Sequence, residues 1–209
     1  MRLIFALAAT FIAAAPALAG GPAKSVVELF TSQGCSSCPP ADAALSNVID
    51  QGTSVALAWH VDYWDYLGWK DTFSSPAATS RQARYASRIG GGSYTPELVV
   101  NGARGSSSSS ILGGAGLAVP VSVSGGEAHI GAGAGNANVF LVSFTPSATV
   151  PIARGENAGH SITYRNVVTN MKSLGEWNGS ALSLAAGSGN CAVIVQRPGQ
   201  GEIIGAAYC

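Results

Sequence analysis

Residues 26–45, VVELFTSQGCSSCPPADAAL, contain a short apolar strand, two cysteines separated by two residues, and the beginning of a helix. Prolines at first-turn positions and apolar residues at helical spacing predict that this helix starts around the second cysteine. Cys35 then lies just before the helix, where unpaired N–H groups and the helix dipole stabilise a thiolate. Cys38 follows one turn later, within reach of a mixed disulfide at Cys35. We therefore predict Cys35 as a nucleophile and Cys38 as the resolving thiol.

Strands and helices alternate around this motif, from residue 25 to about residue 102. The segments VVELF, SVALAW and ELVVNG are predicted strands. A second helix is predicted from Ser75 as its cap and Pro76 at its first position to Gly90 as its stop. This order implies a parallel pair of strands joined by a right-handed crossover.

The dipeptide Thr95-Pro96 stands immediately before the last of these strands. In this layout it resembles the cis-proline loop of thioredoxin-fold proteins. The resemblance implies that the loop faces the dithiol and that Pro96 helps to hold the substrate chain.

The chain begins with MRLIFALAATFIAAAPALAG, an arginine followed by an apolar run and small residues. This order predicts a secretory signal peptide over residues 1–19; the alternative is a membrane anchor. No later segment has about 20 continuous apolar residues, the length needed to span a bilayer. We expect a periplasmic or secreted protein, in which four cysteines, an even number, favour disulfides.

Short apolar segments separated by Gly, Pro, Asn and Ser occupy the second half of the chain, after a serine- and glycine-rich stretch that ends near residue 117. They predict a small antiparallel β-sandwich or barrel. In this half, CAVIVQ and EIIGAAYC flank RPGQG, and a hairpin centred there pairs Cys191 with Cys209. We predict a structural disulfide between these two cysteines; the alternative is two free thiols.

Four motifs together resemble one family: VVELFTSQGCSSCPPAD, HVDYWDYLGWKD, YTPELVVNG, and GENAGHSITYRNVV with LGEW. It is the secreted thioredoxin-like family catalogued as domain of unknown function 1223. The resemblance implies an α/β thioredoxin-like domain with the Cys-x-x-Cys at residues 20–117, followed by a β-rich, sandwich-like domain at residues 118–209. It implies no reaction.

Glu28, on the strand before the cysteines, is a candidate proton relay. In thioredoxins a buried acid under the dithiol moves the proton of the resolving cysteine, and this resemblance points to Glu28. The alternative is an outward-facing or ion-paired strand residue. His60, at the end of the next strand, is either a group that polarises a thiol or binds a metal, or a hydrogen-bonded structural residue.

Two further segments, rich in polar and aromatic residues, allow more than one interpretation of their role. The loop HVDYWDYLGWKD is either a binding rim that includes His60, Asp62 and Asp65, or a lid of aromatic residues packed on the second half. The aromatic residues are Tyr63, Trp64, Tyr66 and Trp69. The segment from GENAG onward supplies polar residues that we interpret as turn chemistry and a solvated strand face. These residues are Glu156, Asn157, His160 and Arg165.

Composition and residue spacing exclude several classes of function. The formal net charge is zero, so no basic face for nucleic acid is expected. Structural zinc is disfavoured because the other cysteines and the histidines are scattered along the chain. The leading prediction is a thiol–disulfide oxidoreductase that uses Cys35 and Cys38 without a cofactor, its partners being protein thiols or disulfides or a redox protein. The alternative is a non-catalytic binding protein, or one that holds Cu(I) at Cys35 and Cys38.

Overall fold

The computed structural model describes residues 23–104 and 116–209. The predicted signal peptide, residues 1–19, lies outside the described residues, as does most of the serine- and glycine-rich stretch. Within the described part, the helices and strands have the following bounds: β1 Ser25–Thr31, α1 Pro39–Gln51, β2 Ser54–His60, α2 Pro76–Ile89, β3 Glu97–Val100, β4 Ala103–Arg104, β5 Val121–Ser124, β6 Glu127–Ile130, β7 Ala137–Pro151, β8 Ser161–Trp177, β9 Leu182–Ala185, β10 Cys191–Gln196 and β11 Ile203–Tyr208.

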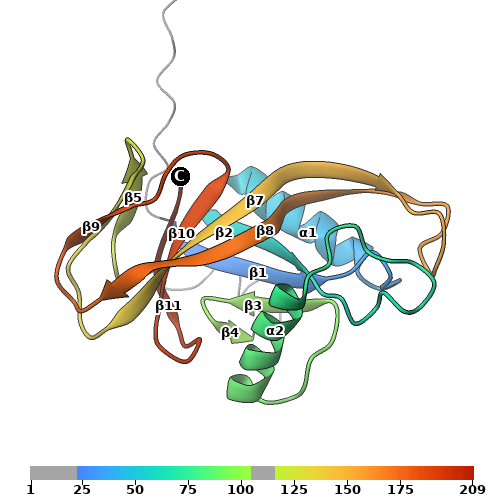
Figure 1. The fold of residues 1–209 in the computed structure, drawn as a ribbon, viewed down its shortest axis with the longest axis horizontal. Helices are drawn as coiled ribbons and strands as arrows, with labels where there is room; N and C mark the ends of the chain where they lie inside the picture. Colours follow the sequence, from blue (N-terminus) through green and yellow to red (C-terminus); the bar gives the residue numbers. More distant parts are fainter. Residues whose placement is uncertain (1–22, 105–115) are drawn as a thin grey trace, which may run out of the picture.

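The protein has a mixed α/β fold with one large mixed sheet and a separate small antiparallel sheet (Figure 1). The large sheet has eight strands in the order β11-β10-β7-β8-β2-β1-β3-β4. Its β1 and β2 are parallel, as the strand–helix–strand pattern predicts, with Ser25 opposite Ser54 and Thr31 opposite His60. Strand β3 runs antiparallel to β1. The beginning of β3 therefore lies beside the carboxyl end of β1.

Strands from the second half of the chain extend this same sheet. Strand β8 joins β2 in parallel at Ala58 and Val167, and β7, β10 and β11 follow outward. The three strands β5, β6 and β9 form the separate sheet at one end of the molecule (Figure 1). Periodicity in the sequence locates strands but does not say which strands pair. The long hairpin β7–β8 thus belongs to the large sheet rather than to an independent sandwich.

Each face of the large sheet has its own covering. Helix α1 packs Leu45 and Val48 on Val27 and Leu29 of β1. Helix α2 covers the other face, where its Ala78 and Tyr85 join a second cluster with Val26, Phe30, Val55 and Leu57. These two sets alternate along β1, as side chains do on opposite faces of a strand. A third cluster fills the space between the small sheet and strands β7, β10 and β11. No helix among the described residues is long and apolar enough to cross a membrane.

The helix ends show how local sequence sets the element boundaries. The side chain of Ser75 caps α2 by accepting a hydrogen bond from the Ala78 N–H, and Gly90 ends this helix at φ 87°, as predicted. Helix α1 begins at Pro39, so Cys38 is its N-cap residue and not a residue inside the helix. Proline has no N–H to give to a preceding carbonyl. The first hydrogen bonds of α1 therefore come from residues 41 and 42, and both go to the Cys38 carbonyl.

A disulfide joins Cys191, at the start of β10, to Cys209, just after β11, with the two Cα atoms 5.2 Å apart. The adjacent residues Ala192 and Tyr208 are directly paired in this hairpin. The bond therefore ties the last residue of the chain to the sheet.

We expect the double variant Cys191→Ala/Cys209→Ala to lose about 3 kcal/mol of unfolding free energy, because a cross-link over about 18 residues restricts the unfolded chain by roughly this amount. Urea unfolding followed by far-UV circular dichroism measures the loss. Either single substitution should cost about as much as both, since each removes the same cross-link. A loss below about 1 kcal/mol in all three variants would contradict the expectation.

Candidate functional site

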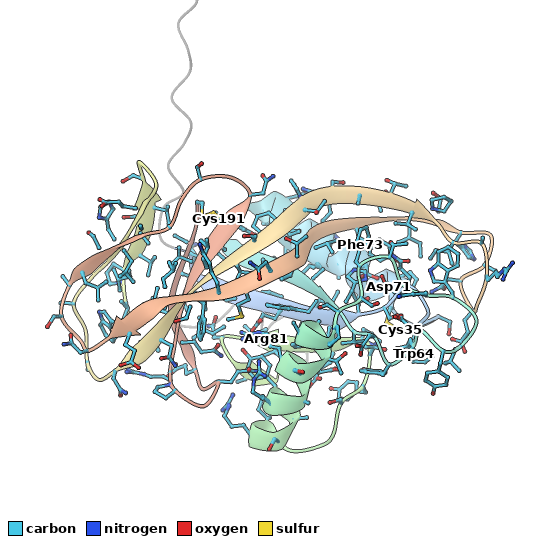
Figure 2. All side chains as sticks on the ribbon, in the orientation of Figure 1. Cys35, Trp64, Asp71, Phe73, Arg81 and Cys191 are labelled. Carbon is cyan, nitrogen blue, oxygen red and sulfur yellow. A yellow bond between two sulfur atoms is a disulfide. The ribbon has the colours of Figure 1, made fainter. Side chains whose placement is uncertain are left out.

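Cys35 and Cys38 form a disulfide in the loop between β1 and α1, with their Cα atoms 5.4 Å apart. Both residues are buried, with exposed fractions of 1% and 0%, whereas Ser36 and Ser37 between them are exposed. Figure 2 shows Cys35 near Trp64, Asp71 and Phe73 and well away from Cys191. The two disulfides of the molecule are thus separate features.

The loop after β2 holds the segment that leads into Cys35. The backbone N–H of Gln33 donates to Asp71 Oδ2 at 2.8 Å, and its side-chain Oε1 accepts from Trp69 Nε1 at 2.8 Å. Its Nε2 donates to Thr72 Oγ1 at 2.9 Å. Gln33 is fully buried, and these contacts use both its backbone and its amide. The loop after β2 therefore forms one wall of the disulfide site.

The connection between β7 and β8 forms a second wall. The buried side chain of Asn157 donates from Nδ2 to the carbonyl oxygens of Gln33 and Cys35, both at 2.9 Å. Next to it, Glu156 accepts a hydrogen bond from the backbone N–H of Ser36 at 3.2 Å. The sequence suggested only turn chemistry for this segment, because no local pattern shows that residues about 120 positions apart will meet. Asn157 is thus a site residue that the sequence analysis missed.

The peptide bond between Thr95 and Pro96 is cis. Strand pairing puts Glu97 opposite Phe30, so Pro96 lies at the end of β1 that leads to the cysteines. Trp64 connects the two loops: its Nε1 donates to Thr95 Oγ1 at 2.8 Å, and its Cβ would lie 3.2 Å from a Cβ added at Gly34. The absence of a side chain at position 34 allows this close approach.

Asp42 is a buried carboxyl one turn along α1 from Cys38. Its Oδ2 accepts a hydrogen bond from Thr31 Oγ1 at 3.1 Å, whereas Oδ1 has no partner among the described residues. Burial raises the pKa of Asp42 to about 7, with His60 and Thr31 opposing the shift and Asp71 adding to it. Residues four apart on a helix share a face, so Asp42 lies on the same side of α1 as Cys38.

His60 and Asp71 continue this buried polar group. His60 Nδ1 lies 2.7 Å from Asp71 Oδ2, the oxygen that also accepts from the N–H of Gln33. The imidazole is fixed edge-on between Phe73 and Tyr164, with ring centroids 5.3 and 4.8 Å away. Its Nε2 has no partner in the described part of the chain. His60 thus has a hydrogen-bonded structural setting, which is one of the two alternatives that the sequence leaves open.

Glu28 lies on the other face of the sheet. Its Oε1 accepts from Arg81 Nε at 2.6 Å, and its Oε2 accepts from Arg81 Nη2 at 3.0 Å and from the Tyr85 hydroxyl at 2.6 Å. Burial and the neighbouring Glu28 raise the pKa of Tyr85 well above its usual value. Along β1, Glu28 alternates with Val27 and Leu29, the residues that face α1. The geometry is that of an ion-paired strand residue, separated by the sheet from the helix that Cys38 caps.

The remaining candidates from the sequence mostly hold loops in place. Asp65 accepts from the N–H of Asp71 at 3.1 Å and so stabilises the loop after β2 internally. Asp62 accepts from Thr79 Oγ1 at 2.6 Å and so ties this loop to α2. Trp69 packs against Gly155 of the β7–β8 connection, which fits the lid interpretation for this residue, whereas Tyr66 is 80% exposed.

Metal ligands do not gather in the described part. Within residues 23–104 and 116–209, no group of three or more His, Cys, Asp or Glu side chains is arranged to hold a metal ion. His129 bonds to Ser183, and Arg165 pairs with Asp50 on the surface. A metal bound by Cys35 and Cys38 would thus have only their two sulfur atoms as ligands from the described residues.

Comparisons with known proteins identify the family but not a reaction. A crystal structure of a protein from Agrobacterium tumefaciens is 36% identical, with a TM-score of 0.75 over 89% of this chain and 93% of that one. HBP35 of Porphyromonas gingivalis is similar in fold alone: it is 12% identical, with a TM-score of 0.54 over 90% of this chain and 75% of that one. No curated protein matches the sequence. The model of the family described as "Protein of unknown function (DUF1223)" matches residues 26–196, and the chain is a member of this family.

Proposed function

We propose that the protein is an exported thiol–disulfide oxidoreductase whose first half is a thioredoxin-like domain. The observation that carries the proposal is the disulfide between Cys35 and Cys38 at the start of α1, with the Thr95-Pro96 loop at the same end of β1. A helix start favours the thiolate form of a nearby cysteine, and the thiolate is the nucleophile in disulfide exchange. The second disulfide, at Cys191, agrees with an oxidising compartment, either the periplasm or the extracellular space.

In the proposed reaction, the thiolate of reduced Cys35 attacks one sulfur of a partner disulfide. A mixed disulfide forms and the partner's other sulfur leaves as a thiolate. Cys38 then loses its proton and attacks the Cys35 sulfur, which forms the Cys35–Cys38 disulfide and releases the second thiol of the partner. Two electrons pass from the protein to the partner. The same steps in reverse oxidise a partner dithiol.

Asp42 is the group that we propose to accept the proton of Cys38. Its carboxyl is buried, shares the helix face of Cys38 and has a pKa raised to about 7 by burial, so it can accept a proton near neutral pH. We assign this role to Asp42 in place of Glu28, because Glu28 is held by Arg81 on the opposite face of the sheet. Glu28 is then a structural ion pair.

Partner binding is proposed at the rim formed by the cis-proline loop and the loop after β2. Tyr94, one residue before Thr95, is 45% exposed, and Tyr66 and Leu67 are 80% and 43% exposed. Exposed aromatic and aliphatic side chains next to a reactive site suit a peptide chain of a partner protein. Pro96 would hold the backbone of that chain beside Cys35.

The reduction potential of the Cys35–Cys38 pair tests the proposal. The protein is equilibrated in glutathione buffers of graded potential and alkylated, and peptide masses report this pair separately from Cys191–Cys209. A potential between roughly −120 and −270 mV is expected, which is the range of working oxidoreductases. A potential below about −300 mV would identify a structural disulfide and overturn the proposal.

A second candidate function follows from the burial of both cysteines, whose exposed fractions are 1% and 0%. In this proposal the fold is a binding scaffold and the disulfide holds the start of α1 in place. In a variant of it, the reduced cysteines hold Cu(I), which accepts soft thiolate ligands. Stoichiometric Cu(I) that is released by Cys35→Ser and by Cys38→Ser would support the copper variant, and exchange activity with protein disulfides would exclude a purely structural bond.

A further inference from the structure

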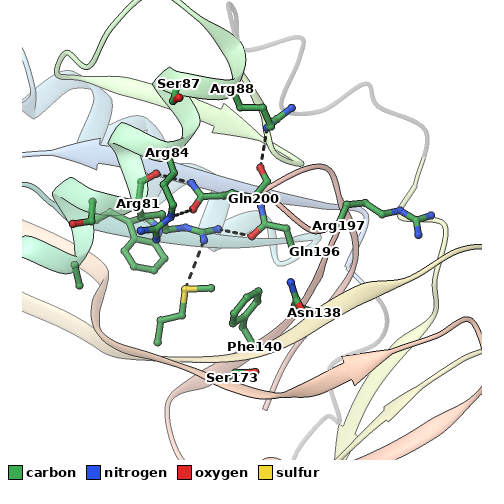
Figure 3. Close-up of a pocket in the computed structure, with 15 residues that line it drawn as sticks. Arg81, Arg84, Ser87, Arg88, Asn138, Phe140, Ser173, Gln196, Arg197 and Gln200 are labelled. Carbon is green, nitrogen blue, oxygen red and sulfur yellow. Dashed lines mark hydrogen bonds between the residues drawn. The ribbon is translucent and has the colours of Figure 1, made fainter.

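A cavity of about 680 Å³ lies between helix α2 and the strands β7, β8 and β10. Figure 3 shows Arg81, Arg84 and Arg88 reaching from α2, with Phe140 and Ser173 on the strands across from them. The cavity lies on the α2 face of the sheet, whereas α1 and Asp42 lie on the other face. Its volume falls in the range of about 300–1,000 Å³ typical of small-molecule sites.

The charged groups of this cavity are all cationic. Four arginines line it, at positions 81, 84, 88 and 197, and no aspartate or glutamate is among its described lining residues. Glu28 forms an ion pair with Arg81 and neutralises its charge. Arg84 and Arg88 have no carboxylate partner in the described part of the chain. Arg84 Nε donates to Gln200 Oε1 at 2.8 Å and Arg88 Nε to the Gln200 carbonyl at 2.9 Å, and Arg88 Nη2 also donates to the Gly102 carbonyl. The uncompensated charge attracts an anion.

Hydrogen-bond donors remain available around the same cavity. The Nη groups of Arg84 make no hydrogen bond to described residues, and Nη1 of Arg81 meets only the weak sulfur acceptor of Met171, at 3.6 Å. Trp59 also lines the cavity, and its buried Nε1 has no partner among the described residues. A buried N–H without an acceptor is unfavourable. A bound molecule that carries acceptor oxygens would satisfy such groups.

The apolar lining completes the site. The Trp59 ring, Phe140 and Met171 supply aromatic and thioether surface beside the arginines. We propose that the cavity binds a small amphiphilic organic anion, with its carboxylate or phosphate at Arg84 and Arg88 and its flat apolar body along this surface. Planar guanidinium groups match both kinds of oxyanion. The site does not involve the Cys35–Cys38 pair, so this proposal does not depend on the proposed redox function.

Matched probes test the charge requirement on the unmodified protein. Naphthoate, naphthyl phosphate and the neutral alcohol naphthalenemethanol share one apolar body and are titrated by calorimetry. At least one of the two anions should bind with one-to-one stoichiometry and at least about tenfold more tightly than the alcohol, and the tighter anion identifies the head group. Among the indole N–H signals of the four tryptophans, that of Trp59 should shift most. Equal affinity for the anions and the alcohol, or no binding at millimolar concentration, would overturn the proposal.

Variants then test the location. Arg84→Gln/Arg88→Gln should weaken binding of the anion at least about tenfold and leave binding of the alcohol unchanged. Arg154→Gln, at an exposed arginine of the β7–β8 connection outside the cavity lining, is the matched control and should bind like the wild type. Circular dichroism checks that the double variant is folded. If it is not folded, the comparison of the three probes on the wild-type protein still tests whether the cavity requires an anion. Unchanged anion affinity in the folded double variant would overturn the assignment.

Discussion

Replacing Cys35 with serine should reduce disulfide exchange to below about a thousandth of the wild-type rate. A serine hydroxyl is not ionised near neutral pH and cannot form a mixed disulfide, so the first covalent step is lost. The measurement is the reduction of a protein disulfide by the pre-reduced protein, followed by the loss of that disulfide. Ser36→Ala is the matched control, because Ser36 is exposed in the same loop and contacts Glu156 only through its backbone N–H.

The complementary substitution Cys38→Ser should stop the reaction one step later, after the mixed disulfide has formed. Cys35 still attacks, but the mixed disulfide cannot be resolved, so the partner stays attached and is detected by mass. Trapping at Cys35 in this variant and inactivity of Cys35→Ser together assign the two roles. Wild-type activity in folded Cys35→Ser, or trapping through Cys38 instead, would contradict the assignment.

Asp42→Asn should change the pH dependence of stability by on the order of 4 kcal/mol. The pKa of Asp42 is raised from 3.8 to about 7 by burial, and each unit corresponds to about 1.36 kcal/mol. Between pH 4 and pH 7 the unfolded chain has lost this proton while the folded protein keeps it, so the carboxyl increasingly disfavours folding as pH rises. Above pH 7 the cost is constant. Asparagine has no proton to lose and removes this cost.

Urea unfolding at pH 4 and pH 8 measures the effect as the difference between variant and wild type, in which other titrating groups cancel. The variant should gain stability relative to the wild type as the pH rises. Asp50→Asn is the control on the same helix: its side chain is 64% exposed, and it should change stability by less than about 0.5 kcal/mol at both pH values. Parallel pH profiles for Asp42→Asn and wild type would refute the raised pKa.

The same variant separates a structural from a chemical role for Asp42. A group that accepts the Cys38 proton should slow the resolving step when it is removed, so Asp42→Asn should accumulate the mixed disulfide without slowing its formation. A purely structural effect would leave the ratio of these two rates unchanged.

The burial of Asp42 has a signal in the sequence of α1. Cys38, Asp42 and Leu45 follow the i, i+4, i+7 spacing of one helix face, and Leu45 is buried. This spacing alone predicts that the carboxyl lies on the buried side of α1. Glu28 stands on the strand before the cysteines, but side chains alternate between the two faces of β1 and Glu28 belongs to the face covered by α2.

Elements that depend on near neighbours can be predicted from the sequence alone. The Cys-x-x-Cys before a helix, the Ser75 cap, the stop at Gly90 and the short strands all follow from turn chemistry, capping and periodicity. These features involve residues within a few positions of one another, so their patterns can be recognised in the sequence.

Contacts between distant segments, in contrast, are known only from the folded structure. It placed β8 beside β2, so that the strands of the second half continue the first sheet, and it brought Asn157 onto the carbonyl of Cys35. It also gathered the arginines of α2 opposite Phe140 around one cavity. Strand neighbours and buried polar partners are selected by packing and hydrogen bonding over more than a hundred residues of chain, and no local preference specifies them.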